Sequence, residues 1–228
     1  MLSAQLAFIS ALIIIFSIIF YGGYTEDKNI IKRTIKKQKP KYVKTCFYLT
    51  AGIYTVGVDF PEGKYKLTAK QNYGDVATSN NVKNGIDQTL GVGYKNIASV
   101  FNNLILENGD TLTIDGELIL EFYSEKVNAS IAQRKVAGQE INLVAGNYIC
   151  GTDFKVGTYD IELIENYGYV TVRNKKNISY IKFRKFFGED DNQLKKFKNC
   201  SIINGDKLEV SGSLYVKLTP SKSNYIYD

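Results

Sequence analysis

The hydrophobic positions of this chain follow two patterns, one near the N-terminus and another over most of the remaining residues. From Leu6 to Tyr21 no residue is charged, and with its flanking residues this stretch approaches the ~20 residues that cross a bilayer as a helix. Later in the chain apolar and polar residues alternate, as around Tyr65, Leu67 and Ala69, which is the period of half-buried strands. We therefore expect a transmembrane helix over residues 1–24 and all-β structure beyond it.

The residues at the end of the apolar stretch indicate that it stays on the protein. A cleavable signal peptide needs small residues before the cut, whereas Phe20 and Tyr21 precede Gly22 and Gly23. A buried core helix is the alternative, but a stretch that is apolar on every side is rare in soluble folds. We expect an uncleaved, single-pass membrane anchor.

A basic stalk is expected over residues 25–45. Its cations are Lys28, Lys32, Arg33, Lys36, Lys37, Lys39, Lys41 and Lys44, and no cation precedes the apolar stretch. The positive-inside rule places such a flank, and the chain beyond it, in the cytoplasm. Each cation near an anionic membrane also contributes about 1 kcal/mol of attraction, so the stalk is expected to lie against the membrane surface.

The rest of the chain contains a duplication. Residues 51–76 align with 145–170 at an offset of 94, and residues 101–120 align with 197–216 at an offset of 96. This period is longer than that of solenoid repeats, so each copy should be a domain. We expect a β-domain over residues 46–124, a linker over 125–143, a second β-domain over 144–220 and a tail over 221–228.

Turn signals separate the expected strands within each copy. Asn108-Gly109 and Asn204-Gly205 are the pair typical of type I′ hairpin turns, in which both central residues have positive φ. The segment from Phe60 to Gly63 reads as another turn, with Pro61 at its second position. Seven or eight short strands per copy predict two tandem β-sandwich or jelly-roll-like domains.

Both copies contain the motif G-x-Y-x-x-G-x-D-F-x-x-G-x-Y, which we expect to be structural. Its members include Gly57, Asp59, Gly63 and Tyr65 in the first copy, and Gly151, Asp153, Gly157 and Tyr159 in the second. The two aspartates could be calcium ligands, but an Asp ahead of a tight turn more often binds backbone N–H groups. The repeated tyrosines at 54, 65 and 73, and at 148, 159 and 167, could stack on sugars, although a core position is favoured.

The motif resembles G-x-Y-x-V-G-x-D-I-P-x-G-x-Y, the signature of uncharacterised domains found in surface proteins and lipoproteins of Gram-positive bacteria. Phe60 and Phe154 stand where that family has Ile, and Lys155 replaces its Pro. The resemblance implies an extracytoplasmic module and supplies no catalytic residues. It opposes the orientation predicted from the stalk charges, and on its strength we favour the outward orientation over the cytoplasmic one.

Composition limits the chemistry that the chain could perform. Histidine is absent, which removes imidazole bases, His metal ligands and Ser-His-Asp arrangements. Cys46, Cys150 and Cys200 are widely spaced, without the close pairs of a zinc site or the even count of a disulfide framework. We predict no enzyme, no metal site and no cofactor, and keep an enzyme that works with carboxylates alone only as a third hypothesis.

The two copies differ in charge. Residues 51–124 hold five Lys and Arg against nine Asp and Glu, a net charge of −4, whereas residues 145–220 hold twelve against nine, a net charge of +3. The excess of cations in the second copy lies beside aromatic residues, a composition typical of surfaces that bind polyanions. The predicted ligand-binding residues are Arg173, Lys175, Lys176, Lys182, Phe183, Arg184 and Lys185.

A solvated basic face with its aromatic residues turned inward is the alternative interpretation of this segment. Glu189, Asp190 and Asp191 interrupt the basic run and argue against nucleic acid as the partner. The sequence thus predicts a non-catalytic, membrane-anchored binding module at the cell envelope, with anionic lipid or wall polymer as its partner. The alternative is a structural or assembly protein whose β-domains pack with each other or with partner proteins.

Overall fold

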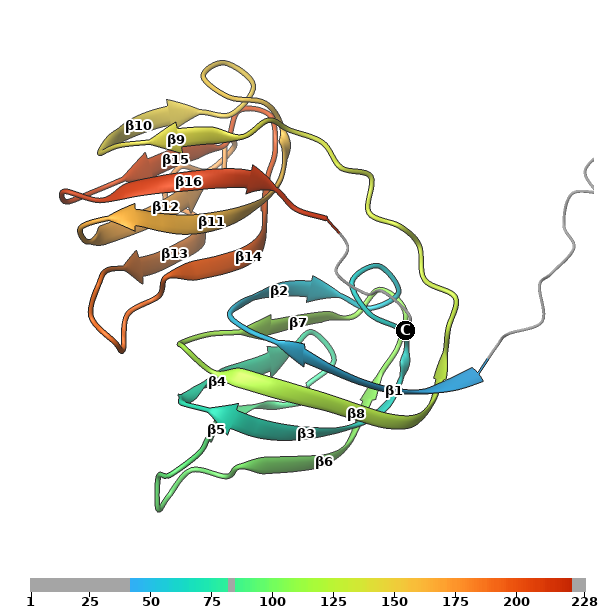
Figure 1. Ribbon diagram of the computed structural model, residues 1–228. Coiled ribbons are helices and arrows are strands. Elements are labelled where there is room, and N and C mark those ends of the chain that lie inside the picture. Colours follow the sequence, from blue (N-terminus) through green and yellow to red (C-terminus); the bar gives the residue numbers. More distant parts are fainter. Residues whose placement is uncertain (1–41, 82–84, 223–228) are drawn as a thin grey trace, which may run out of the picture. The chain divides into compact units, whose positions relative to one another are not determined.

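The computed structural model describes residues 42–81 and 85–222, which form β-strands and no helix (Figure 1). The all-β prediction is confirmed for these residues. The expected transmembrane helix over 1–24, nearly all of the stalk and residues 223–228 lie outside them. Within the described ranges no helix has the length and apolar character needed to cross a membrane.

The strands fall into two series of eight in the described part of the chain. The first series is β1 (Tyr42–Leu49), β2 (Gly52–Thr55), β3 (Gly63–Gln71), β4 (Tyr73–Thr78), β5 (Asp87–Gly91), β6 (Val100–Leu106), β7 (Thr111–Ile114) and β8 (Ile119–Asn128). The second is β9 (Ile141–Leu143), β10 (Gly146–Ile149), β11 (Gly157–Glu165), β12 (Gly168–Arg173), β13 (Ile181–Phe187), β14 (Lys196–Ile202), β15 (Lys207–Val210) and β16 (Tyr215–Pro220).

The order of strands is the same in both series. The first series pairs as β1-β8-β3-β6 and β5-β4-β7-β2, and the second as β9-β16-β11-β14 and β13-β12-β15-β10. Each strand of the second series therefore takes the place of its counterpart in the first. A parallel bridge between Gly52 of β2 and Lys198 of β14 joins two of these sheets into one of eight strands.

Two hydrophobic clusters lie between the sheets, each built mainly from one series, although Ala51 and Ile53 of the first series pack into the second cluster. In the first, the rings of Phe60, Tyr65 and Phe122 pack with centroids 5.6 to 5.9 Å apart. In the second, Phe183 packs edge-on against Phe197 at 4.8 Å. Alternation along the strands produces these clusters, because neighbouring residues of a strand point to opposite faces.

The Asn-Gly turns differ from the expected hairpins. Gly109 and Gly205 have φ of +91° and +84°, but Asn108 and Asn204 do not have positive φ, so the type I′ prediction was wrong. A positive φ at the third residue alone is the pattern of a type II turn. Each turn also joins strands of different sheets, β6 to β7 and β14 to β15, rather than the two arms of a hairpin.

Three strands extend into segments that the sequence assigned to the stalk and the linker. Strand β1 starts at Tyr42 and pairs with β8, which continues to Asn128. Strand β9 lies in the expected linker and pairs with β16 through Leu143 and Val216. The basic composition around Lys44 conceals the alternation of β1, in which Lys44 points to solvent and lies 3.8 Å from Glu125.

Candidate functional site

The duplicated motif forms a tight loop after β2 and again after β10. Asp59 accepts the backbone N–H of Thr55 through Oδ2 at 2.8 Å, and Asp153 accepts that of Ile149 at 2.6 Å. Gly57 and Gly151 have φ of +83° and +90°, a conformation in which any larger residue is strained. The carboxylates thus stabilise the backbone of the loop, as expected. The N–H group that each carboxylate binds, however, lies four residues before the aspartate.

The second duplicated block docks on this loop. Gly109 donates its N–H to the carbonyl of Val56 at 3.1 Å, and Gly205 donates to that of Cys150 at 2.7 Å. Asp110 and Asp206 each accept a backbone N–H within their own turn, at 2.9 and 3.1 Å. The two blocks are far apart in sequence but form one hydrogen-bonded unit.

Four of the repeated tyrosines bind the carbonyl of the residue four positions earlier. The hydroxyl–carbonyl pairs are Tyr54 with Thr50, Tyr65 with Pro61, Tyr148 with Val144 and Tyr159 with Lys155, at 2.5 to 2.9 Å. Burial raises the pKa of the Tyr54 and Tyr159 hydroxyls. This is the geometry of a tyrosine corner, which ties a strand to the preceding loop. Tyr73 and Tyr167 differ from the core expectation, since 44% and 62% of their surfaces are exposed.

We predict that Tyr65→Phe and Tyr159→Phe each lower the free energy of unfolding by about 1 kcal/mol, because each loses its hydrogen bond to the carbonyl four positions earlier. Tyr73→Phe is the matched control, since its ring is half exposed. Chemical denaturation of the three variants measures the effect. Equal stability of Tyr65→Phe and Tyr73→Phe would show that the corner hydrogen bonds contribute nothing.

The predicted ligand-binding residues are not equally available to a ligand. Lys182 lies 2.5 Å from Asp206, Lys185 lies 2.5 Å from Asp115, and Arg173 lies 3.9 Å from Glu209. Phe183 is buried in the second hydrophobic cluster, so its ring cannot meet a ligand on the surface. Lys175, Lys176 and Arg184 are exposed and have no carboxylate partner among the described residues.

The pairing of Lys182 with Asp206 is a structural contact. Asp206 is fully buried and accepts hydrogen bonds from Lys182 Nζ and from the Ile203 N–H through Oδ2. A buried carboxylate is costly unless a cation and further hydrogen bonds compensate it. Lys182 therefore serves the fold rather than a ligand.

The remaining exposed cations lie close in sequence to two exposed apolar side chains, Ile178 and Tyr180. Ile178 and Tyr180 are exposed in the loop between β12 and β13, next to Lys175 and Lys176. Two backbone hydrogen bonds order this loop, from Asn174 N–H to the Tyr180 carbonyl at 3.1 Å and from Tyr180 N–H to the Asn177 carbonyl at 2.9 Å. We call Lys175, Lys176, Ile178, Tyr180 and Arg184 the β12–β13 surface.

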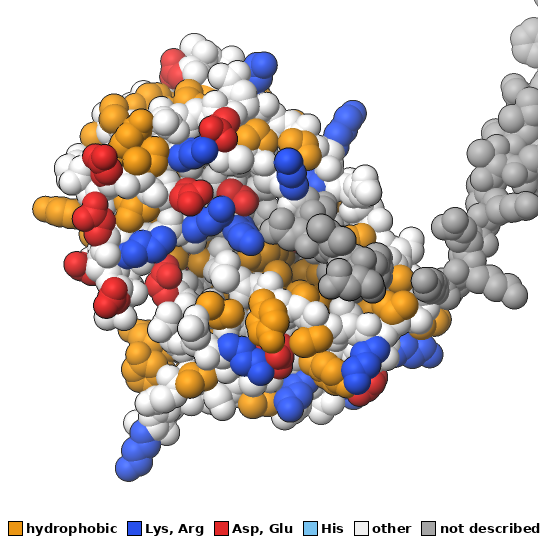
Figure 2. All heavy atoms as spheres, viewed as in Figure 1, with side chains coloured by type: hydrophobic (Ala, Val, Ile, Leu, Met, Phe, Trp, Pro, Cys, Tyr) orange, Lys and Arg blue, Asp and Glu red, His pale blue; other side chains and the backbone are white. Residues whose placement is uncertain are grey.

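Arg184 lies on strand β13, opposite Thr171 of β12, rather than in the loop. Its guanidinium lies 4.4 Å from the centre of the Tyr169 ring, a cation–π arrangement that leaves the charge accessible. Over the face shown in Figure 2, Lys and Arg side chains are intermixed with Asp and Glu rather than gathered in one field. Because Arg173, Lys182 and Lys185 are paired with carboxylates, the accessible basic surface is smaller than the sequence count suggests.

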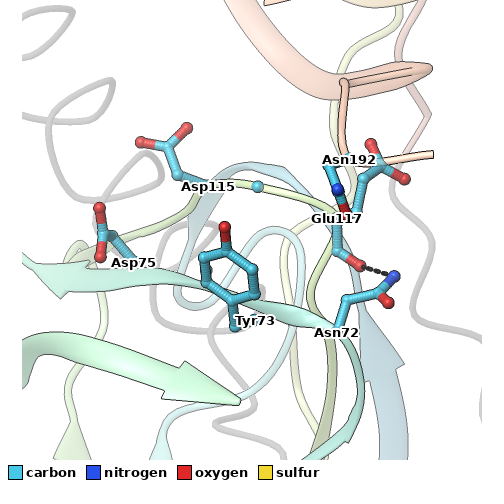
Figure 3. Close-up of a pocket in the computed structure, with 8 residues that line it drawn as sticks. Asn72, Tyr73, Asp75, Asp115, Glu117 and Asn192 are labelled. Carbon is cyan, nitrogen blue, oxygen red and sulfur yellow. Dashed lines mark hydrogen bonds between the residues drawn. The ribbon is translucent and has the colours of Figure 1, made fainter. Parts of the chain in front are cut away.

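A small cavity of about 150 Å³ lies beside β4. Asp75, Asp115 and Glu117 supply carboxylates to its lining, and in Figure 3 the amide of Asn72 donates to the Glu117 carbonyl. Burial raises the pKa of Glu117, opposed by a hydrogen bond from the Lys195 N–H. The described residues contain no group of His, Cys, Asp and Glu that could hold a metal ion. The cavity is therefore a small pocket of mixed polar and apolar lining.

All three cysteines are free. Cys46 is exposed on β1, whereas Cys150 and Cys200 are buried in the second series. Burial raises the pKa of the Cys200 thiol to about 12 and also raises that of Cys150. The pKa of the Cys46 thiol is raised as well, so exposure alone makes Cys46 the thiol placed to react with reagents in the folded protein.

No protein-family model matches the chain, and no curated protein matches it.

Proposed function

We propose that this chain is a non-catalytic, membrane-anchored binding protein with two jelly-roll-like domains. Two four-stranded sheets with the orders 1-8-3-6 and 5-4-7-2 match the eight-stranded jelly roll, and each series has these orders. The two hydrophobic clusters, each built mainly from one series, support a domain for each series. The apolar stretch from Leu6 to Tyr21 supports the anchor.

The proposed partner is a phosphate-rich polyanion at the membrane or wall, bound by the β12–β13 surface. The observation that carries this proposal is the combination of Lys175, Lys176 and Arg184, which no described carboxylate pairs, with exposed Ile178 and Tyr180. Cations attract phosphate groups, while exposed Ile and Tyr side chains suit a membrane interface or a polymer with apolar faces. Lys182, Lys185 and Phe183 are left out of this surface, because the first two are paired and the third is buried.

The test uses residues 40–228, which form one compact unit and lack the apolar stretch that would insert into bilayers by itself. Cosedimentation is measured with vesicles of neutral lipid, with vesicles containing anionic lipid, and with insoluble phosphate-rich wall polymer. We expect binding to an anionic partner that weakens as salt rises from about 50 to about 500 mM, because salt screens charges beyond ~10 Å. The vesicle and polymer samples distinguish the two sources of phosphate. Absence of binding to all of them at low salt would rule out the polyanion.

The outward orientation yields a separate prediction. A membrane-impermeant maleimide applied to intact cells should label Cys46 in the native protein, because this thiol is exposed. The buried Cys150 and Cys200 should react only after denaturation, which makes the native signal specific for one site. Cys46→Ser is the control. Labelling of Cys46 only after cells are lysed would instead place the β-domains in the cytoplasm.

The assembly alternative keeps its own support. Val144, Ile149 and Val156 are exposed apolar residues around β10 of the second series. Such side chains can pack against another protein. The motif carboxylates Asp59 and Asp153 accept backbone N–H groups and stabilise turns. These two carboxylates therefore do not support the hypothesis of an enzyme that works with carboxylates alone.

A further inference from the structure

The motif loop of the first series holds a short extended segment of the same chain. Ala132 donates its N–H to the Gly57 carbonyl at 2.7 Å. Two residues later, Arg134 Nη2 lies 2.6 Å from both carboxylate oxygens of Asp59. Only 15% of the Arg134 side chain and 3% of the Asp59 side chain are exposed. The loop thus recognises a backbone N–H and, two residues on, a guanidinium.

The second series contains the same loop in the same conformation. Gly151 has φ of +90°, against +83° for Gly57, and Asp153 binds the N–H group four residues before it, as Asp59 does. The bridge between Cys150 and Phe154 likewise repeats that between Val56 and Phe60. Any segment that fits the first loop therefore meets the same backbone carbonyl and the same carboxylate in the second.

The second loop nevertheless faces solvent. Asp153 is exposed and, among the described residues, only the Ile149 N–H donates to it. No described residue donates to the Gly151 carbonyl. Val156 is exposed beside the loop and offers an apolar contact. A carboxylate, a carbonyl and an apolar side chain are therefore presented together.

The linker, which covers the first motif loop through Ala132 and Arg134, does not cover the Gly151–Asp153 loop in the same way. Past Arg134 it reaches the second series at Tyr159, where a side chain at Gly138 would collide with the tyrosine ring. A side chain at Gly157 would likewise collide with the Ala137 carbonyl. The linker thus contacts the end of the motif at Tyr159, while Asp153 remains exposed.

We propose that the Gly151–Asp153 loop is a docking site for an extended, arginine-bearing segment of another protein. The segment would donate a backbone N–H to the Gly151 carbonyl and place an arginine two residues later on Asp153. Arginine suits this role because its planar guanidinium can bind both oxygens of a carboxylate. The occupant of the first loop serves as the template for this partner.

The experiment uses the full-length chain in neutral detergent and a fluorescent peptide with the sequence of residues 129–136, ASIAQRKV. Anisotropy measures its binding, beside a second peptide in which Gln replaces the arginine. We expect saturable binding of the first peptide and about tenfold weaker binding of the second, a loss equivalent to ~1.4 kcal/mol. The peptide comparison leaves the protein unchanged, so it does not depend on the folding of any variant.

Two protein variants locate the peptide. Asp153→Asn should weaken binding of the arginine peptide by about tenfold, again a loss of ~1.4 kcal/mol. Glu165→Gln removes one charge from another exposed acid of the second series and should bind like the unaltered protein. Absence of saturable binding, equal binding of both peptides, or equal loss in the two variants would overturn the proposal.

Discussion

Replacing Lys182 with Met is expected to lower the free energy of unfolding by about 3 to 5 kcal/mol, the range for breaking a buried ion pair. The substitution leaves Asp206 fully buried without its cation, and only the Ile203 N–H remains as a described partner of Oδ2. Methionine retains most of the volume of the lysine stem. The loss should therefore come from the unpaired carboxylate rather than from a cavity.

The control is Lys196→Met, which removes an exposed pair with Glu162 at 3.5 Å. Exposed ion pairs contribute at most about 1 kcal/mol, so this variant should be close to the unaltered protein. Adding Asp206→Asn to Lys182→Met should restore part of the stability, because Asn carries no charge and can still accept the Ile203 N–H. Urea denaturation measures all four proteins. If Lys182→Met and Lys196→Met are equally stable, the buried pair does not have its assigned role.

Asp59→Asn is expected to cost about 3 kcal/mol, because it breaks a mostly buried pair with Arg134. The same change at Asp153 should cost about 1 kcal/mol or less, since that carboxylate is exposed and loses only the strength of one hydrogen bond. The two sites have the same local conformation and serve as controls for each other. Equal losses would indicate that Arg134 does not stabilise the first loop.

Limited proteolysis gives an independent measurement of the same contact. Arg134 and the Ala132 N–H hold the linker against the first motif loop. Asp59→Asn should therefore speed cleavage within residues 129–140 by a protease that does not require a basic residue, whereas Asp153→Asn should leave it unchanged. Unchanged cleavage in Asp59→Asn would mean that the linker is held elsewhere.

Alternation of apolar residues made the strands predictable. In β3, Tyr65, Leu67 and Ala69 are buried while Lys64 and Lys66 are exposed, as the two-residue period requires. The sequence located the Asn-Gly turns correctly. It assigned them to type I′ hairpins, whereas each turn joins strands of different sheets and has positive φ at the glycine but not at the asparagine. Their geometry depends on Val56 and Cys150, whose carbonyls accept the glycine N–H groups across long sequence separations. Local propensity does not contain that information.

The composition of the binding segment was visible in the sequence, but its accessible part was not. Lys182 and Lys185 contributed to the count of cations, yet Asp206 and Asp115 approach them from 24 and 70 residues away. Phe183 and Arg184 are neighbours in sequence but lie on opposite faces of β13, one buried and one exposed. Only the three-dimensional pairing shows which charges remain for a partner.

The most direct test of the binding proposal compares two pairs of charge reversals in residues 40–228. Lys175→Glu with Lys176→Glu alters the β12–β13 surface, and Lys64→Glu with Lys66→Glu alters two exposed lysines of the first series by the same charge. Cosedimentation with the anionic partner at about 50 mM salt is the measurement. We expect the first pair to weaken binding at least about tenfold, since each surface cation contributes about 1 kcal/mol, and the second pair to leave it nearly unchanged. Equal weakening by both pairs would mean that only net charge matters, and binding that survives the first pair would contradict the proposed surface.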